Sequence, residues 1–178
     1  MKLFHVSEVP SIQLFEPRPS PSAFESISGD VVFAISDKLL HNYLMPRDCP
    51  RVTFYAGPLT SEQDRIQFLD HGDSEYVVSV ESKWLDAIRR TVLFCYELPT
   101  ESFHLLDECA GYYISYESIK PVSIERMDDL LRKLTSRQVE LRIMPSLKKL
   151  AEAVVQSTMS YSLIRMRNAS TSSLPENH

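Results

Sequence analysis

Residues 1–20 read MKLFHVSEVPSIQLFEPRPS, an apolar start followed by a proline-rich end. The segment 2–6 favours a strand around His5, because aromatic and β-branched side chains pack well on a pleated sheet. Arg18 follows a second apolar pair and lies between two prolines, whose rings fix the backbone dihedral φ. A histidine and an arginine this close to apolar anchors predict a ligand pocket that forms at the start of the fold.

The chain as a whole has the size and composition of one globular domain. It has 178 residues, of which 43% are hydrophobic, and a formal net charge of -5. Proteins that bind large nucleic acids usually carry a basic surplus that neutralises phosphates, so such a partner is not expected. An acidic net charge still allows a local basic pocket for one small anionic or nucleotide ligand.

Cysteine usage and hydropathy are typical of a cytoplasmic protein. Cys49, Cys95 and Cys109 form no CxxC pair, so reduced thiols are favoured over a disulfide framework or a zinc site. No apolar run approaches the roughly 20 residues that cross a bilayer, and the N-terminus does not resemble a signal peptide. We therefore expect no metal and no membrane partner, and the oligomeric state stays open.

Apolar runs and turn residues predict a mixture of strands and short helices. The predicted strands are 2–6, 31–35, 52–55, 76–80, 92–96, 112–116 and 139–143. The predicted helices start at the capping residues Ser36 or Asp37, Thr60 or Ser61, Ser82, Ser123 and Ser146, and end near 44, 69, 90, 134 and 155. The segments 103–110 and 160–167 are ambiguous, and 71–73 reads as a turn.

This order of elements has no regular βαβ rhythm, and several strands follow one another without a helix between them. It favours a single α+β domain over residues 1–169, with a mixed or mainly antiparallel sheet and flanking short helices. The polar end of the chain, residues 170–178, is expected to be a disordered tail.

His5 has two interpretations because it lies inside an apolar strand. As a core residue its ring would form a hydrogen bond with the backbone. As a site residue a neutral imidazole offers one donor and one acceptor, enough to hold a ribose hydroxyl or an amide. Ser7 lies two residues further on, so in a strand its side chain shares a face with His5, which favours the second interpretation.

Arg18 is a candidate for binding the anionic part of a ligand. A guanidinium on a proline-held backbone loses little conformational entropy when it binds a phosphate or a carboxylate through two hydrogen bonds. The alternative is an ion pair with Glu16 or Glu8, which would make Arg18 structural.

A second loop stiffened by proline carries Arg47 and Arg51. These arginines could complete an anion site, or they could form ion pairs with Asp48. His41 and Tyr43, on the preceding short helix, either line the same cleft or belong to a solvated helix face.

No pair of carboxylates has a spacing that identifies a general acid and a general base. The carboxylates considered for such a role are Glu97, Glu117, Glu140 and Glu152. The chain contains no GxGxxG, GxxxxGK[ST] or GxSxG motif, which disfavours a Rossmann dehydrogenase, a P-loop enzyme and an α/β-hydrolase.

Several segments together resemble a bacterial family of unknown function, over most of the chain to about Ala169. The segments that carry this resemblance are 3–7 (LFHVS) with Ile12, 15–18 (FEPR), 31–34 (VVFA), 46–52 (PRDCPRV) and 139–142 (VELR).

The opening segment is also distantly similar to the ADP-ribosyltransferase-like superfamily, whose members often begin with an H-x-[ST] strand and continue with a strand resembling VVFA. The similarity covers about thirty-five residues and implies that His5 and Ser7 hold the nicotinamide-side ribose or amide of NAD. It implies a phosphate contact for Arg18. Tyr43 and Arg47 are further candidates for binding the cofactor, from their places on the short helix and in the second proline-stiffened loop. The catalytic carboxylate of the superfamily would be Glu117 or Glu97. NAD would be a substrate, and no tightly bound cofactor is expected.

The resemblance gives a leading hypothesis and three alternatives. The leading one is an ADP-ribosyltransferase-like protein that acts at the nicotinamide–ribose bond, with His5 and Glu117 as its catalytic residues. The alternatives are a non-catalytic module that binds a small anion, a plain interaction protein, and an enzyme that processes nucleic-acid ends, which the acidic charge disfavours.

Overall fold

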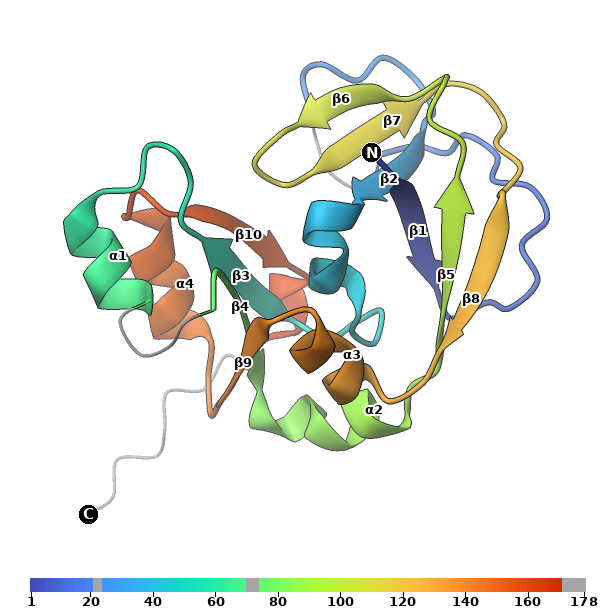
Figure 1. Cartoon of the computed structure of the whole chain (residues 1–178). Helices are drawn as coiled ribbons and strands as arrows, with labels where there is room; N and C mark the ends of the chain where they lie inside the picture. The colour runs from blue at the N-terminus through green and yellow to red at the C-terminus, as the bar shows by residue number, and fades with distance from the viewer. Residues whose placement is uncertain (21–23, 70–73, 171–178) are drawn as a thin grey trace. The chain divides into compact units, whose positions relative to one another are not determined.

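Two sheets form the framework of the protein in the computed structural model, which describes residues 1–20, 24–69 and 74–170 (Figure 1). A six-stranded sheet has the order β6-β7-β2-β1-β5-β8, and a four-stranded sheet has the order β10-β3-β4-β9. Neighbouring strands are antiparallel except β4 and β9, which are parallel. The predicted α+β class, with mainly antiparallel sheets and short helices, is confirmed.

Eleven predicted elements begin and end within two residues of their expected positions. The six-stranded sheet consists of β1 (Leu3–Ser7), β2 (Val32–Ser36), β5 (Leu93–Leu98), β6 (His104–Asp107), β7 (Tyr112–Ser115) and β8 (Ser123–Met127). The four-stranded sheet consists of β3 (Arg51–Tyr55), β4 (Tyr76–Glu81), β9 (Val139–Met144) and β10 (Ser160–Ile164). The α-helices are α1 (Glu62–Leu69), α2 (Leu85–Arg90), α3 (Leu130–Ser136) and α4 (Lys148–Val155), and the 3-10 helices are η1 (Asp37–Tyr43), η2 (Ser82–Trp84) and η3 (Met166–Asn168). Among the described residues, no helix is long and apolar enough to cross a membrane.

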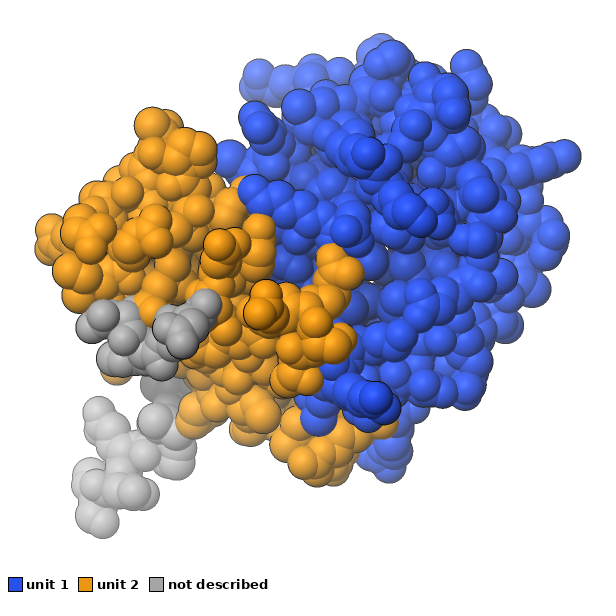
Figure 2. Space-filling model, in the orientation of Figure 1, with its two compact units in different colours: residues 1–47, 90–133 blue, residues 48–89, 134–178 orange. Residues whose placement is uncertain are grey.

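The chain groups into two compact units, and each unit is built from two separate segments (Figure 2). Unit 1 comprises residues 1–47 and 90–133 and holds the six-stranded sheet. Unit 2 comprises residues 48–89 and 134–178 and holds the four-stranded sheet. The sequence did not predict this division, and a single domain over 1–169 stays a prediction.

The core of unit 1 lies against one face of its sheet. Leu3 pairs with Leu98, and His5 pairs with Tyr96, so these side chains project from the same face of β1 and β5. The chain after β1 packs on that face, because Phe15 joins the buried cluster and its backbone exchanges two hydrogen bonds of 2.8 Å with Ile119. The cluster consists of Leu3, Phe15, Val32, Ala34, Tyr96, Leu98, Phe103 and Ile119.

The core of unit 2 combines side chains from its sheet with side chains from the helices α1 and α4 (Figure 1). Ser61 begins α1 as predicted, because its Oγ accepts a hydrogen bond of 3.2 Å from the backbone N–H of Asp64. The buried cluster consists of Val52, Phe54, Phe68, Leu69, Val77, Leu147, Val154 and Met159.

One predicted helix was wrong in its first half, and one of the two proposed caps of η1 does not form. The segment Ser123–Met127 is not the start of a helix but the strand β8, and the helix α3 begins only at Leu130. The edge of β5 supplies hydrogen-bond partners to this segment, and Asp129 has a positive φ of 50°, which a continuous helix excludes. Ser36 precedes η1 but forms no side-chain capping hydrogen bond.

The two segments whose sequence pattern was ambiguous form strands and part of a 3-10 helix. Residues 103–110 contain β6, and 160–167 contain β10 and the start of η3. The expected turn at 71–73 and residues 171–178 of the expected tail lie outside the described residues. The first residue of that tail, Ser170, is hydrogen-bonded to Glu81.

Candidate functional site

His5 is held in unit 1 by one hydrogen bond and one ring contact. Its Nδ1 donates to the backbone oxygen of Phe33 at 3.1 Å, and its ring lies 4.7 Å from the ring of Phe15, centroid to centroid. Because a carbonyl oxygen can only accept, Nδ1 carries the proton and Nε2 of the neutral ring is an acceptor. The predicted backbone hydrogen bond is therefore present, and one nitrogen stays available.

Burial lowers the pKa of His5, and the positive charges of Arg47 and Arg18 lower it further, against an opposing effect of the Phe33 carbonyl. The ring is thus neutral at physiological pH, and both arginines of the predicted site are near enough to act on it electrostatically. Among the described residues of unit 1, neither guanidinium forms a hydrogen bond or an ion pair. The predicted ion pair of Arg18 with Glu16 or Glu8 does not form.

Backbone contacts place the two arginines. Arg18 and Val31 exchange two backbone hydrogen bonds of 3.0 and 2.9 Å, so Arg18 is tied to the start of β2. The backbone N–H of Arg47 donates to the carboxylate of Glu8 at 2.9 Å, which ties Arg47 to the end of β1. Both side chains extend from fixed backbone and are exposed, as binding of a soluble anion requires.

Ser7 ends β1 on the same face as His5, as predicted from the strand period. Its Oγ accepts a hydrogen bond of 3.1 Å from the backbone N–H of Val9. A hydroxyl that accepts from the backbone still has its own proton to donate, so Ser7 can donate to a ligand.

The sheet register separates the two candidate carboxylates. Glu97 follows Tyr96, the partner of His5, so Glu97 projects from the opposite face of the sheet. There it forms an ion pair of 2.9 Å with Lys2 and accepts a hydrogen bond from Ser123. Glu97 is therefore not placed to act with His5.

Glu117 lies in the exposed segment after β7. Its backbone N–H donates to Ser115 Oγ at 3.1 Å, and its carboxylate has no partner among the described residues. Two residues further on, Ile119 bridges to Phe15, whose ring contacts His5. Glu117 is thus an exposed carboxylate without a partner among the described residues.

Tyr43 belongs to an aromatic group and not to the surroundings of His5. Its hydroxyl is 2.6 Å from the hydroxyl of Tyr112, and the ring of Tyr112 contacts the rings of Phe33 and Phe24. Phe33 alternates with Val32 and Ala34 of the core, so its side chain projects from the face opposite His5. His41 of the same 3-10 helix is buried, so the prediction of a solvated face was wrong for it.

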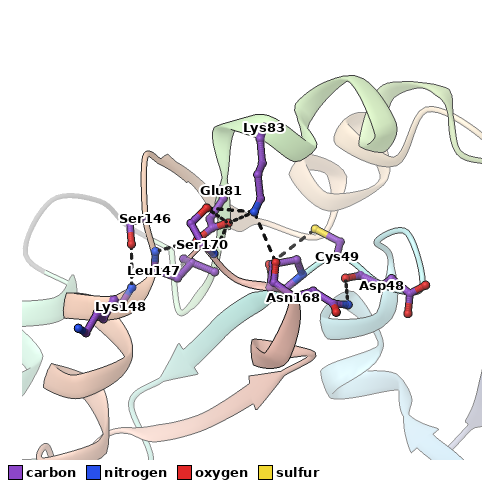
Figure 3. Close-up of polar contacts among 10 residues, drawn as sticks. Asp48, Cys49, Glu81, Lys83, Ser146, Leu147, Lys148, Asn168 and Ser170 are labelled. Carbon is purple, nitrogen blue, oxygen red and sulfur yellow. Dashed lines mark hydrogen bonds and ion pairs between the residues drawn. The ribbon is translucent and has the colours of Figure 1, made fainter. Parts of the chain in front are cut away.

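Unit 2 contains a polar cluster that the sequence analysis did not identify (Figure 3). Glu81 at the end of β4 is fully buried and forms an ion pair of 3.2 Å with Lys83. Its carboxylate also accepts hydrogen bonds from the backbone of Leu147 and from Ser170. Burial raises the pKa of Glu81, but these donors outweigh burial and lower it overall. The only sequence signal was an acidic residue at the end of an apolar β run.

Arg51 and Cys49 occupy buried positions in unit 2. Arg51 donates from its guanidinium to the backbone oxygen of Cys49 at 2.8 Å, so this arginine of the predicted anion loop is structural. No group of three or more His, Cys, Asp or Glu side chains that could hold a metal ion occurs within residues 1–20, 24–69 and 74–170.

A family model described as "Family of unknown function (DUF6886)" matches residues 4–169. The protein belongs to this family. No curated protein and no solved structure matches the chain. The resemblance to a family of unknown function is confirmed, whereas its bacterial origin and the ADP-ribosyltransferase-like fold stay predictions.

The DUF6886 match covers every candidate residue of unit 1 and Glu81 of unit 2. It ends one residue before Ser170. The two polar centres of this DUF6886 protein differ in chemistry. His5, Arg18 and Arg47 leave donors and an acceptor available to a ligand, whereas the donors around Glu81 satisfy its carboxylate within the chain.

Proposed function

We propose that unit 1 binds a small anionic ligand of the nucleotide class beside His5, with NAD as the leading candidate. The observation that supports this most is the state of His5. Its Nδ1 is occupied by Phe33, its Nε2 has no partner among the described residues, and two arginines without ion pairs act on the ring. A neutral acceptor beside two cations suits a ligand with hydroxyl or amide donors and phosphate acceptors.

Each side chain has a role in this proposal. His5 Nε2 accepts a hydrogen bond from a ribose hydroxyl or an amide, and Ser7 donates from its hydroxyl. Arg18 and Arg47 bind phosphate oxygens, because a guanidinium matches their geometry with two parallel hydrogen bonds. Tyr43 has no role in this proposal, since it belongs to the aromatic group of Tyr112 and Phe33 on the other face of the sheet.

The enzymatic form of the proposal is cleavage or transfer at the nicotinamide–ribose bond. As nicotinamide leaves, the ribose becomes electron-poor, and a carboxylate near it stabilises that state more than the bound substrate. Glu117 supplies this carboxylate in our proposal, since it is exposed and has no partner among the described residues.

Calorimetry with NAD, ADP-ribose and inorganic pyrophosphate tests the binding proposal. We expect heat with NAD in the wild type and a loss of affinity of about tenfold or more in Arg18→Ala and Arg47→Ala, since a hydrogen bond to a charged group contributes about 1.5–3 kcal/mol. In His5→Ala we expect a smaller loss, because a hydrogen bond between neutral groups contributes about 0.5–1.5 kcal/mol. Arg167→Ala is the matched control, because it removes an exposed charge from unit 2. No heat with any of the three ligands at millimolar concentration would remove the proposal.

A non-catalytic binding module is the second candidate, because no contact joins Glu117 to His5 among the described residues. Release of nicotinamide from NAD distinguishes the two forms. Release that is lost in Glu117→Gln, with NAD affinity unchanged, supports catalysis. Binding without release in the wild type supports the non-catalytic module.

A further inference from the structure

We propose that residues 166–170 form a strap that the buried carboxylate of Glu81 latches onto unit 2. The latch is a two-state device, since the strap is held as a whole or released as a whole. Neutralising Glu81, or placing a negative charge on Ser170, releases it.

The latch itself consists of one carboxylate and the last described residue. The backbone N–H of Ser170 donates to the two oxygens of Glu81 at 2.9 and 3.2 Å, and the Ser170 hydroxyl donates to Oε2 at 3.1 Å. Lys83 completes the arrangement with an ion pair of 3.2 Å to Glu81 and a hydrogen bond of 3.0 Å to Ser170 Oγ. Figure 3 shows Lys83 and Ser170 directed toward Glu81.

The same carboxylate is anchored on its other side. Glu81 Oε1 accepts a hydrogen bond of 3.4 Å from the backbone N–H of Leu147, just before α4. Leu147 is fully buried in the core of unit 2, so the latch point is fixed to the sheet by β4 and to the helix layer by α4. The strap is therefore the part of the cluster that can detach while Glu81 stays in place.

The strap is a distinct segment of the chain. It begins after Arg165, whose positive φ of 54° ends the run of β10 and redirects the chain into η3. Met166 packs against the core of unit 2. Asn168 then donates from its side chain to the backbone oxygen of Asp48 at 2.7 Å, which is a second attachment point.

The energetics make Glu81 the controlling attachment. A buried charge is stable only while donors surround it, so the strap and the charged form of Glu81 stabilise each other. Removing the charge weakens every hydrogen bond from Ser170 at once, because hydrogen bonds to an ionised acceptor are about twice as strong as neutral ones. A second negative charge at position 170 would lie beside the carboxylate of Glu81 with Lys83 as the one cation that contacts both, and like charges at this distance repel.

Hydrogen exchange of the full chain, followed by mass spectrometry, tests the latch. The amide N–H groups of Asn168, Ala169 and Ser170 are all hydrogen-bonded, so they exchange slowly while the strap is held. We expect exchange of 166–170 to rise about tenfold or more in Glu81→Gln and in Ser170→Asp, while the amides of α1 stay as in the wild type. Ser170→Ala is expected to cause a smaller rise, because the backbone N–H of Ser170 still reaches Glu81.

The matched control is Glu152→Gln, which neutralises an exposed carboxylate on α4 and is expected to change nothing. If Glu81→Gln does not fold, Ser170→Asp still tests the latch. Ser170 lies outside the core cluster of unit 2, so this variant is expected to fold. Unchanged exchange of 166–170 in Ser170→Asp would overturn the proposal. An equal rise in 166–170 and α1 would also overturn it, because the cluster would then support unit 2 as a whole.

Discussion

The hydroxyl of Tyr96 donates a hydrogen bond to the backbone oxygen of Val9, and the two oxygens are 2.5 Å apart. The same hydroxyl accepts a hydrogen bond of 3.2 Å from the backbone N–H of Ile12. Its ring meets the ring of Phe15 edge-on at 5.2 Å, and Tyr96 pairs directly with His5 across the sheet. One side chain thus fixes the connection between the strand of His5 and the loop of Arg18.

Tyr96→Phe is expected to destabilise the protein and loosen this connection. The variant removes the hydrogen bonds to the Val9 oxygen and the Ile12 N–H, and a hydrogen bond of this kind contributes about 0.5–1.5 kcal/mol. Urea unfolding measures the loss, with Tyr161→Phe as the control, because Tyr161 lies exposed on the edge strand β10. Equal stability of the two variants would contradict the role of the Tyr96 hydroxyl.

His5 is expected to make stability depend on pH below neutrality. Burial, with Arg47 and Arg18, holds the pKa of His5 below its ordinary value of 6.5. As the pH falls below 6.5, the unfolded chain takes up a proton before the folded chain does, so the free energy of unfolding decreases. At higher pH both states are neutral and this effect is absent.

Urea unfolding between pH 5 and pH 8 compares the wild type with His5→Gln, whose amide can still donate to the Phe33 oxygen. We expect a shallower pH dependence in the variant, since Gln does not titrate. The other histidines are common to both proteins and cancel in the difference. Parallel curves for the two proteins would show that His5 titrates alike in the folded and unfolded chain.

The three thiols are expected to differ in reactivity. Burial raises the pKa of Cys49 to about 11, with Glu81 acting in the same direction and Arg51 against it. Cys95 is buried as well, whereas Cys109 is exposed. Because the thiolate is the reactive form, a disulfide reagent at pH 8 should modify Cys109 rapidly and the others only after unfolding. A rapid phase that persists in Cys109→Ser would refute this assignment.

Gly111 is expected to tolerate alanine less well than Gly29 does. Both have positive φ, of 69° and 90°, where a Cβ costs about 1–2 kcal/mol. At Gly111 an added Cβ would also lie 2.6 Å from Ser36 Oγ and 3.0 Å from Leu39 Cδ1, whereas at Gly29 it meets nothing within 4 Å. The melting temperature of Gly111→Ala should therefore be lower than that of Gly29→Ala. The reverse order would show that Ser36 moves aside freely.

Local patterns in the sequence were sufficient for most elements but not for their partners. The apolar run at 31–35 predicted β2, and the alternation at 139–143 predicted β9. The parallel pairing of β9 with β4 has no local signal, since it joins residues more than fifty positions apart. The helix predicted from Ser123 begins only at Leu130, because Ser123–Met127 pairs with β5, a partner that the local sequence does not contain.

The local sequence also predicted some features of the candidate site but not those that depend on distant partners. The pairing of His5 and Ser7 on one face follows from the strand period, and the structure agrees. The register of β5 directs Glu97 away from the face of His5, and this could not be read from the local sequence. Glu81 was missed because its donors come from Leu147 and Ser170, far along the chain.

The interleaving of the two units has a consequence for the order in which they form on the ribosome. Each unit is interrupted by a segment of the other, so neither can be completed from the first half of the chain. Strand β4 leaves the ribosome long before its parallel partner β9, and its edge stays open while residues 90–133 are synthesised. Pairing across such a distance closes late and slowly, because the entropy of ordering the intervening chain must be overcome first. During translation the nascent chain therefore exposes an apolar strand edge that the finished protein conceals.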